Sequence, residues 1–260
     1  MTDFPNYPYQ KPLIFDSHAH YDDAKFDEIR AELLAELPVH GVCGVVNCGC
    51  DTASSKAALA FAEKYPYFYA AVGIHPENIG GGEVAEIEDL AHRKKCVAIG
   101  EIGLDYYWVD DNKEQQRALF EEQLVLANRL NLPVIVHDRE AHAEMYELLR
   151  QYRPRGVLHC YSGSAEDAAW LTAQGMALGF GGAVTYKGAK RAAKVLAMVP
   201  HELAVLETDC PYMSPEPVRG TRNDSRNIAH VAAKIGEIWQ MDAQSVLDLT
   251  AENAKRIFNQ

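Results

Sequence analysis

Residues 133–159, PVIVHDREAHAEMYELLRQYRPRGVLH, contain one full unit of the pattern that decides the fold. The apolar run 134–137 is followed by an amphipathic stretch at 141–151 and by the apolar run 157–159. Runs rich in Val, Ile and Leu that alternate with helical patterns predict parallel strands joined by helices. Both apolar runs end in a histidine, so the unit also places polar side chains at strand ends.

The same unit recurs along the chain. Several helical patterns begin at a capping residue such as Ser164, and several end near a proline such as Pro133 or Pro200. The predicted strands are 13–17, 44–47, 68–73, 97–101, 134–137, 157–159, 177–180 and 204–207. The predicted helices are 22–37, 52–64, 84–93, 113–130, 141–151, 165–173 and 189–198, and then, after a loop at 211–227, 228–239 and 243–258.

Eight strand–helix units in a chain of 260 residues predict a (β/α)8 TIM barrel, and we expect one domain over residues 1–260. No linker, low-complexity tract or block of charge divides the chain. In such a barrel the active site lies at the carboxyl ends of the strands. The alternative fold is an open, doubly wound sheet, and the positions of the polar residues distinguish the two.

Composition limits the kind of partner. Hydrophobic residues make up 48% and charged residues 24% of the chain, which is enough apolar material to bury a full core. The formal net charge of -12 argues against broad binding along duplex DNA. It does not exclude a nucleic-acid substrate, because bound divalent cations reverse the field inside a small pocket.

Cysteine usage and the absence of targeting segments predict a reduced, cytoplasmic setting with no membrane partner. Residues 1–11 lack the pattern of a signal peptide, and no apolar run is long enough to span a bilayer. Cys48 and Cys50 stand closer together than a usual zinc pair, and no second pair completes such a site, so we expect core or loop thiols. The other cysteines are Cys43, Cys96, Cys160 and Cys210.

Polar residues gather at the ends of the predicted strands. The first strand ends in FDSHAH, and His18 and His20, two residues apart, should point to the same face of an extended chain. Five of the ten histidines stand at strand ends, and the other five lie in helices or connections, where no role is expected. The strand-end residues are His18, His20, His75, Glu101, Asp105, His137, His159, Glu207 and Asp209.

Imidazoles and carboxylates aimed at one small space would be unstable together without a cation. Neutral imidazole nitrogen and carboxylate oxygen suit zinc and similar divalent ions, and manganese and magnesium remain open. Two ions fit the number of ligands better than one, with Glu101 central enough to bridge them. Asp209 is placed to bind metal and to accept a proton from the attacking water. For Glu207, direct ligation and orientation of a ligand histidine are both open.

At this point the motifs resemble one family, the TatD-type deoxyribonucleases of the amidohydrolase superfamily. The resemblance covers nearly the whole chain and implies a barrel with a dinuclear metal centre. It implies metal ligation by six residues, with His75 and Glu207 near the metals or the substrate, and a carboxylate, Glu101, as the bridge. The matching motifs are DSHAH, GIHP, GEIGLDYY, PVIVHDR, VLHCYSG, LETDCPYM and RGTRN. The implied ligands are His18, His20, Glu101, His137, His159 and Asp209.

The segment at 223–225 departs from the family, since Asn223 is followed by Asp224 and Ser225 where Glu-Pro or a similar pair is expected. The resemblance implies hydrolysis of phosphodiester bonds of single-stranded DNA, often from the 3′ end. A small-molecule amide, lactone or phosphoester is the alternative substrate, and a barrel without catalysis, acting as a partner protein, is a second alternative. We expect a monomer.

Candidate substrate contacts surround the predicted metal centre. Tyr106, Tyr107 and Trp108 follow the fourth strand and would stack on bases, or else anchor the loop by packing. Basic side chains near the strand ends would hold phosphates, or else remain solvated at the surface. These basic residues are Arg139, Lys187, Arg219 and Arg222.

Overall fold

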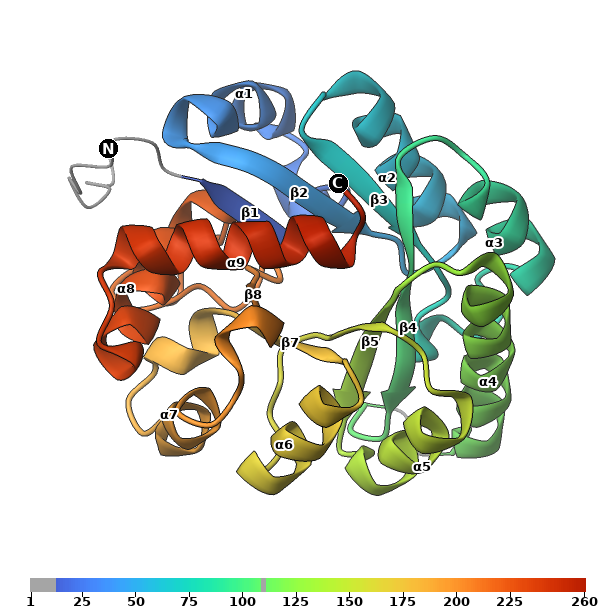
Figure 1. The fold of residues 1–260 in the computed structure, drawn as a ribbon. Helices are drawn as coiled ribbons and strands as arrows, with labels where there is room; N and C mark the ends of the chain where they lie inside the picture. Colours follow the sequence, from blue (N-terminus) through green and yellow to red (C-terminus); the bar gives the residue numbers. More distant parts are fainter. Residues whose placement is uncertain (1–12, 109–110) are drawn as a thin grey trace.

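The computed structural model describes residues 13–108 and 111–260, so the expectation for residues 1–11 lies outside the described part. Within these residues, eight parallel strands form one sheet in which the strand order follows the chain. Helices surround this sheet on its outer side (Figure 1). The strands are β1 (Ile14–Ala19), β2 (Val42–Cys48), β3 (Phe68–Val72), β4 (Cys96–Asp105), β5 (Val134–Arg139), β6 (Gly156–Leu158), β7 (Ala177–Phe180) and β8 (Ala204–Leu206).

The first and last strands meet at the carboxyl end of the sheet. Ala19 and Cys210 form a parallel bridge just beyond β8. The His20 amide donates to the carbonyl of Cys210 at 2.9 Å, and the Asp209 amide donates to the carbonyl of His18 at 3.0 Å. These bonds nearly close the sheet and bring the end of β1 beside Asp209. The fold is therefore a (β/α)8 barrel, as predicted, and not an open sheet.

Most helices follow the predicted pattern, and four have the predicted bounds. The α-helices are α1 (Arg30–Glu36), α2 (Thr52–Lys64), α3 (Val84–Ala91), α4 (Lys113–Leu130), α5 (His142–Tyr152), α6 (Ala165–Ala173), α7 (Lys190–Leu196), α8 (Ile228–Trp239) and α9 (Ala243–Ile257). Short 3-10 helices lie at Ala24–Phe26, Leu37–His40, Pro76–Asn78, Gly182–Thr185, His201–Leu203 and Ser225–Asn227.

The continuous helix predicted over 22–37 is wrong, because α1 begins only at Arg30. The Asp23 side chain accepts the amide of Lys25 and starts a separate 3-10 turn. Arg30 then donates to the carbonyls of Tyr21, Asp22 and Asp23 at 2.6–3.1 Å, which holds this segment as a loop. Polar side chains that bond to nearby backbone favour such turns over helix.

The strand predicted over 97–101 is too short, because β4 continues to Asp105. Its last residues pair with the end of β5, where Gly103 lies opposite His137 and Asp105 opposite Arg139. Gly103 has φ +151°, and a Cβ there would lie 1.9 Å from the carbonyl oxygen of His137, so only glycine fits. Glu101 is therefore held inside a strand rather than at its end.

The buried hydrophobic residues that the structure describes form two clusters, one inside the barrel and one outside it. Alternate residues of the strands, such as Phe15, Val46 and Ile135, fill the interior. Ala251, Ala254 and Phe258 join this inner cluster from α9 and the residue after it, and α9 packs against β1 and β8 (Figure 1). The interior is thus packed and covered by α9, and the polar site is left at the other mouth.

Of the helices within residues 13–108 and 111–260, none combines the length and the apolar character needed to cross a bilayer.

Candidate metal centre

Glu101 lies at the centre of the polar cluster, and its two carboxylate oxygens face two different groups of side chains. Oε1 lies 2.9 Å from His137 Nδ1, 2.9 Å from His159 Nε2 and 3.4 Å from His75 Nε2. Oε2 lies 3.3 Å from His18 Nε2 and 3.4 Å from His20 Nε2. We call these two groups the Oε1 side and the Oε2 side of the site.

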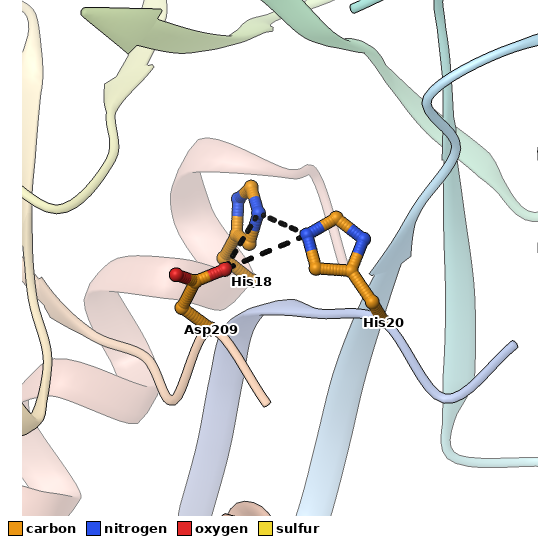
Figure 2. A group of neighbouring side chains, drawn as sticks. All are labelled: His18, His20 and Asp209. Carbon is orange, nitrogen blue, oxygen red and sulfur yellow. Dashed lines mark hydrogen bonds and ion pairs between the residues drawn. The ribbon is translucent and has the colours of Figure 1, made fainter. Parts of the chain in front are cut away.

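The Oε2 side is completed by Asp209, whose Oδ1 lies 3.8 Å from His18 Nε2 and 3.5 Å from His20 Nε2. The two imidazole nitrogens are 2.9 Å apart. Figure 2 shows the three side chains turned toward one point, with Asp209 reaching across from the segment after β8. The backbone of Asp209 is left-handed, with φ 55°, a conformation that Asp tolerates better than most residues.

The distances between neighbouring nitrogen and oxygen atoms would allow one metal ion to bind on each side of Glu101. Zinc binds nitrogen at about 2.0–2.1 Å and carboxylate oxygen at about 2.0–2.2 Å, so two such donors on one ion are at most about 4.3 Å apart. The separations around Oε1 and Oε2 run from 2.9 to 3.8 Å. Each oxygen of Glu101 is thus close enough to its own set of imidazole nitrogens to share one ion with them.

Hydrogen bonds at the opposite ring nitrogens show which imidazole nitrogens are free to ligate. Nδ1 of His20 donates to the carbonyl of Cys48 at 3.0 Å, which leaves the Nε2 lone pair facing Glu101. Nε2 of His137 lies 3.0 Å from Oδ2 of Asp105 and donates to it, which leaves the Nδ1 lone pair facing Glu101. Both rings are held in the tautomer that a metal requires.

His75 has the opposite arrangement. Its Nδ1 accepts the backbone N–H of Glu77 at 3.2 Å, so the proton of the neutral ring is on Nε2. That Nε2 lies 3.4 Å from Oε1 of Glu101 and carries a proton instead of a lone pair. His75 thus turns a proton toward Glu101, whereas His137 turns a lone pair toward it.

Glu207 lies behind His159 and is fully buried. Its Oε1 accepts the backbone N–H of Cys160 and lies 3.7 Å from Nδ1 of His159, on the far side of that ring from Glu101. A Cβ on Gly179 would lie 2.2 Å from Oε2 of Glu207, so glycine leaves the space that the carboxylate fills. This position favours orientation of His159 over direct ligation.

The electrostatics of the cluster keep its carboxylates ionised. Burial alone would raise the pKa of Glu101, but His18, His75 and His159 together hold that pKa well below its usual range. Burial likewise opposes ionisation of Asp209, yet contact with His20 and the charges of His18 and His159 lower its pKa. The site therefore offers negative oxygen atoms to a cation near neutral pH.

Two acidic residues that the sequence analysis left without a role support the site. Asp105, four residues after Glu101 along β4, accepts the amides of Tyr107 and Trp108 as well as bonding to His137. Asp16 is buried and accepts bonds from Thr208 and Ser225, and burial raises the pKa of its carboxyl to about 7. The signal for Asp105 was its spacing, since residues two or four apart on a strand share a face.

The cluster forms the floor of an open cavity of about 570 Å³. Arg139 and Trp108 line one part of its wall, and Trp108 is 61% exposed. Five residues predicted to contact substrate do not line this cavity, namely Tyr106, Tyr107, Lys187, Arg219 and Arg222. Arg222 instead donates to the carbonyl of Lys25 at 2.7 Å. The Tyr106 hydroxyl donates to Glu144 at 2.6 Å, the Arg219 guanidinium lies 4.1 Å above the ring of Tyr186, and Lys187 is exposed elsewhere.

Comparison with known proteins places the chain in a family. The model of the family described as TatD related DNase matches residues 15–259. The chain belongs to this family. It is 36% identical over 252 residues to YabD of Bacillus subtilis, an uncharacterized metal-dependent hydrolase, and the match covers 95% of this chain and 99% of that protein.

Two further relatives of this TatD-family protein span nearly the whole chain. A 3′-5′ ssDNA/RNA exonuclease, TatD of Pectobacterium parmentieri, is 30% identical, with 94% of this chain and 99% of that protein covered. The crystal structure of YjjV, a TatD homologue from Escherichia coli, matches with a TM-score of 0.88 at 31% identity, covering 95% and 98% of the two chains. The protein is thus a metal-dependent hydrolase of the TatD family.

Proposed function

We propose that this protein is a nuclease that hydrolyses phosphodiester bonds of single-stranded DNA from the 3′ end, with two divalent ions at its centre. The observation that carries the proposal is the placement of Glu101, whose oxygens each face a separate set of imidazoles at 2.9–3.4 Å. A relative at 30% identity is named as a 3′-5′ ssDNA/RNA exonuclease, which supports the choice of substrate.

The ligands we propose fall into two sets. His18, His20 and Asp209 would hold one ion on the Oε2 side, and His137 and His159 would hold the other on the Oε1 side. Glu101 would bridge them. Ions bound there would lower the pKa of a water and offset negative charge on the phosphoryl oxygens, which suits hydrolysis of a phosphodiester.

The protein's own groups would complete the reaction. Asp209 is ionised and partly exposed at the cavity floor, with 24% of its side chain accessible, so it is placed to accept a proton from the attacking water. His75 carries its proton on Nε2 and would donate to a phosphoryl oxygen. Arg139, in the cavity wall, would pair with a phosphate of the substrate.

Trp108 is the aromatic side chain that we propose stacks on a base. It lines the cavity and is exposed, whereas its neighbour Tyr107 is exposed but does not line the cavity. The Arg139 guanidinium lies 5.1 Å from the ring centroid of Trp108, so a base and a phosphate would meet adjacent protein groups. Stacking accepts any base, which suits a nuclease without sequence preference.

A second candidate function, hydrolysis of a small phosphoester or lactone, is favoured by the charge of the cavity wall. Asp22, Asp23 and Glu77 line the cavity, and Arg139 is the single Lys or Arg among the described residues that line it. Three acidic side chains repel the phosphates of a long strand. A strand must therefore enter past Arg139 and Trp108 if the nuclease proposal is correct.

The two candidates are separated by one set of assays on metal-loaded protein. Single-stranded DNA labelled at the 3′ end, the same strand closed into a circle, and a panel of small phosphoesters and lactones are offered in parallel. The nuclease proposal expects release of the 3′ label on a mononucleotide in the first cleavage, and no cleavage of the circle. If a small ester is hydrolysed while the DNA stays intact, the nuclease proposal is wrong. The Glu101→Gln protein, expected to be inactive, is the control for a contaminating nuclease in the same assay.

A further inference from the structure

Cys50 lies beside the Oε2 side of the metal centre, although its spacing from Cys48 gave no reason to expect a ligand. Its Sγ is 3.9 Å from Oε2 of Glu101 and 3.9 Å from Nδ1 of His20. It lines the same cavity as Asp209 and His20. Cys50 is thus an additional donor atom on the Oε2 side that the proposed function does not use.

The distances allow a shared ion. Zinc binds thiolate sulfur at about 2.3 Å and carboxylate oxygen at about 2.0–2.2 Å, so the two donors are at most about 4.5 Å apart on one ion. The 3.9 Å between Sγ of Cys50 and Oε2 of Glu101 is within this limit. Sγ of Cys50, a carboxylate oxygen of Glu101 and one ring nitrogen of His20 all lie within 4.8 Å of one another.

Cys48 provides an internal comparison two residues away. Its Sγ lies 3.5 Å from Nδ1 of His18, the nitrogen that faces away from Glu101, and its carbonyl accepts Nδ1 of His20. Cys48 therefore contacts the back of the imidazoles. Cys50 also lies near one such nitrogen, Nδ1 of His20, but in addition it contacts the carboxylate oxygen that a metal ion would share. The two thiols differ in which atoms they meet, and also in exposure, since Cys48 is buried and Cys50 is partly exposed.

We propose that Cys50 is a thiolate ligand of the ion on the Oε2 side, an inference that rests on the proposed dinuclear centre. The thiol proton leaves to solvent as the metal–sulfur bond forms, and no oxidant or reductant is involved. The Oε2 side then holds two imidazoles, two carboxylates and a sulfur, whereas the Oε1 side holds imidazoles and one carboxylate. Thiolate favours zinc and other soft ions over manganese and magnesium, so the two sides select different metals.

The test uses cobalt as a spectroscopic probe on the full-length protein. Cobalt(II) bound to thiolate gives a near-ultraviolet charge-transfer band that imidazole and carboxylate ligands do not give. Wild-type protein loaded with cobalt should show this band, and the Cys50→Ser variant should lose it while keeping the visible ligand-field bands. Cys48→Ser is the matched control and should keep the charge-transfer band, and Cys96→Ser, at the far end of β4, is a second control.

Zinc affinity gives an independent readout. Removal of a ligand or of its supporting contact typically costs roughly ten- to a hundredfold in metal affinity, so Cys50→Ser should weaken one zinc site by that factor and change manganese binding little. A wild-type protein with ligand-field bands but no charge-transfer band would overturn the inference and leave the dinuclear centre intact. A wild-type protein that binds no cobalt would instead overturn the proposed function.

Discussion

The two sides of Glu101 are built in different ways. On the Oε2 side, His18 and His20 come from one strand end and are two residues apart, and only Asp209 arrives from a distant segment. On the Oε1 side, His137 and His159 come from β5 and from the residue after β6, and a buried carboxylate lies behind each ring. The first arrangement depends on local geometry, whereas the second depends on strand pairing and on support from Asp105 and Glu207.

The surroundings differ as well. Asp23 accepts the Tyr212 hydroxyl at 2.8 Å near the Oε2 side, and Asp22 lines the cavity beside it. Near the Oε1 side, Arg139 follows His137 along the chain and stacks over the aromatic pair of Tyr107 and Trp108. Among the described residues that line the cavity, the one Lys or Arg thus lies near the Oε1 side, and we expect an anionic substrate to approach from there.

The largest expected effect comes from removing the one group that both sides share. In Glu101→Gln, neither ion keeps its bridging carboxylate, so both metal sites should weaken and turnover should fall by about a hundred- to a thousandfold or more, as for loss of a group that stabilises charge in the transition state. Metal content and turnover measure this directly. Glu77→Gln removes a carboxylate from the same cavity and should retain both ions, and equal loss in the two variants would refute the bridging role.

The next substitution should weaken metal binding on the Oε1 side and leave the Oε2 side unchanged. Asp105→Asn keeps an oxygen for the amides of Tyr107 and Trp108 but turns an amide donor toward His137 in place of the acceptor, so metal affinity on the Oε1 side should fall roughly ten- to a hundredfold. Titration of metal-free protein should show one weakened site and one unchanged site. If both sites weaken equally, or neither does, the sides are not supported independently.

A smaller effect is expected where the substrate would approach. Trp108→Ala should raise the KM for single-stranded DNA about five- to thirtyfold, which is the lower part of the roughly 1–3 kcal/mol attributed to stacking on one base, because Trp108 is 61% exposed. The kcat should change little. Tyr107→Ala is the neighbouring control, and a KM effect as large as that of Trp108→Ala would place the strand elsewhere.

The smallest effect concerns a histidine behind the Oε1 side. The bond from His142 Nδ1 to Asp138 Oδ2, 2.7 Å long, raises the pKa of His142 above its ordinary 6.5 despite partial burial. A raised folded-state pKa stabilises the protein below the unfolded pKa, and the stability is lost as pH rises through the folded value. Since the ring is 38% exposed, the contribution is below about 1 kcal/mol.

His142→Gln should therefore lower the free energy of unfolding slightly at about pH 6 and not at about pH 9. Urea unfolding at the two pH values measures the difference. In an Asp138→Asn background the pH-dependent part should vanish, and a His142→Gln effect that grows with pH would contradict the assignment.

Much of the architecture could be predicted from local pattern. The helices at 52–64, 113–130, 165–173 and 228–239 have their predicted bounds, because caps such as Asp51 and Ser164 and stops such as Pro133 act on nearby residues. The six predicted metal ligands are brought together by the structure for a similar reason. Each follows or lies within an apolar strand run, and parallel strands of a barrel carry their ends to one mouth.

Other features were decided only by tertiary contact. The length of β4 depends on its pairing with β5, and the break before α1 depends on Arg30 reaching back to loop carbonyls. Tyr106 and Trp108, two positions apart, are both aromatic residues of the same loop, yet one bonds to Glu144 and the other lines the cavity.

The candidate site, too, was determined partly by the sequence and partly by the tertiary structure. Residue types and spacing along the chain determined which imidazoles and carboxylates would gather at the mouth. The tertiary structure decided which ring nitrogen of His75 or His137 is free, and whether Cys48 or Cys50 meets Oε2 of Glu101. The physical reason is that periodicity sets the direction of a side chain along its own strand, whereas a hydrogen-bond partner from another strand sets the tautomer and the distance.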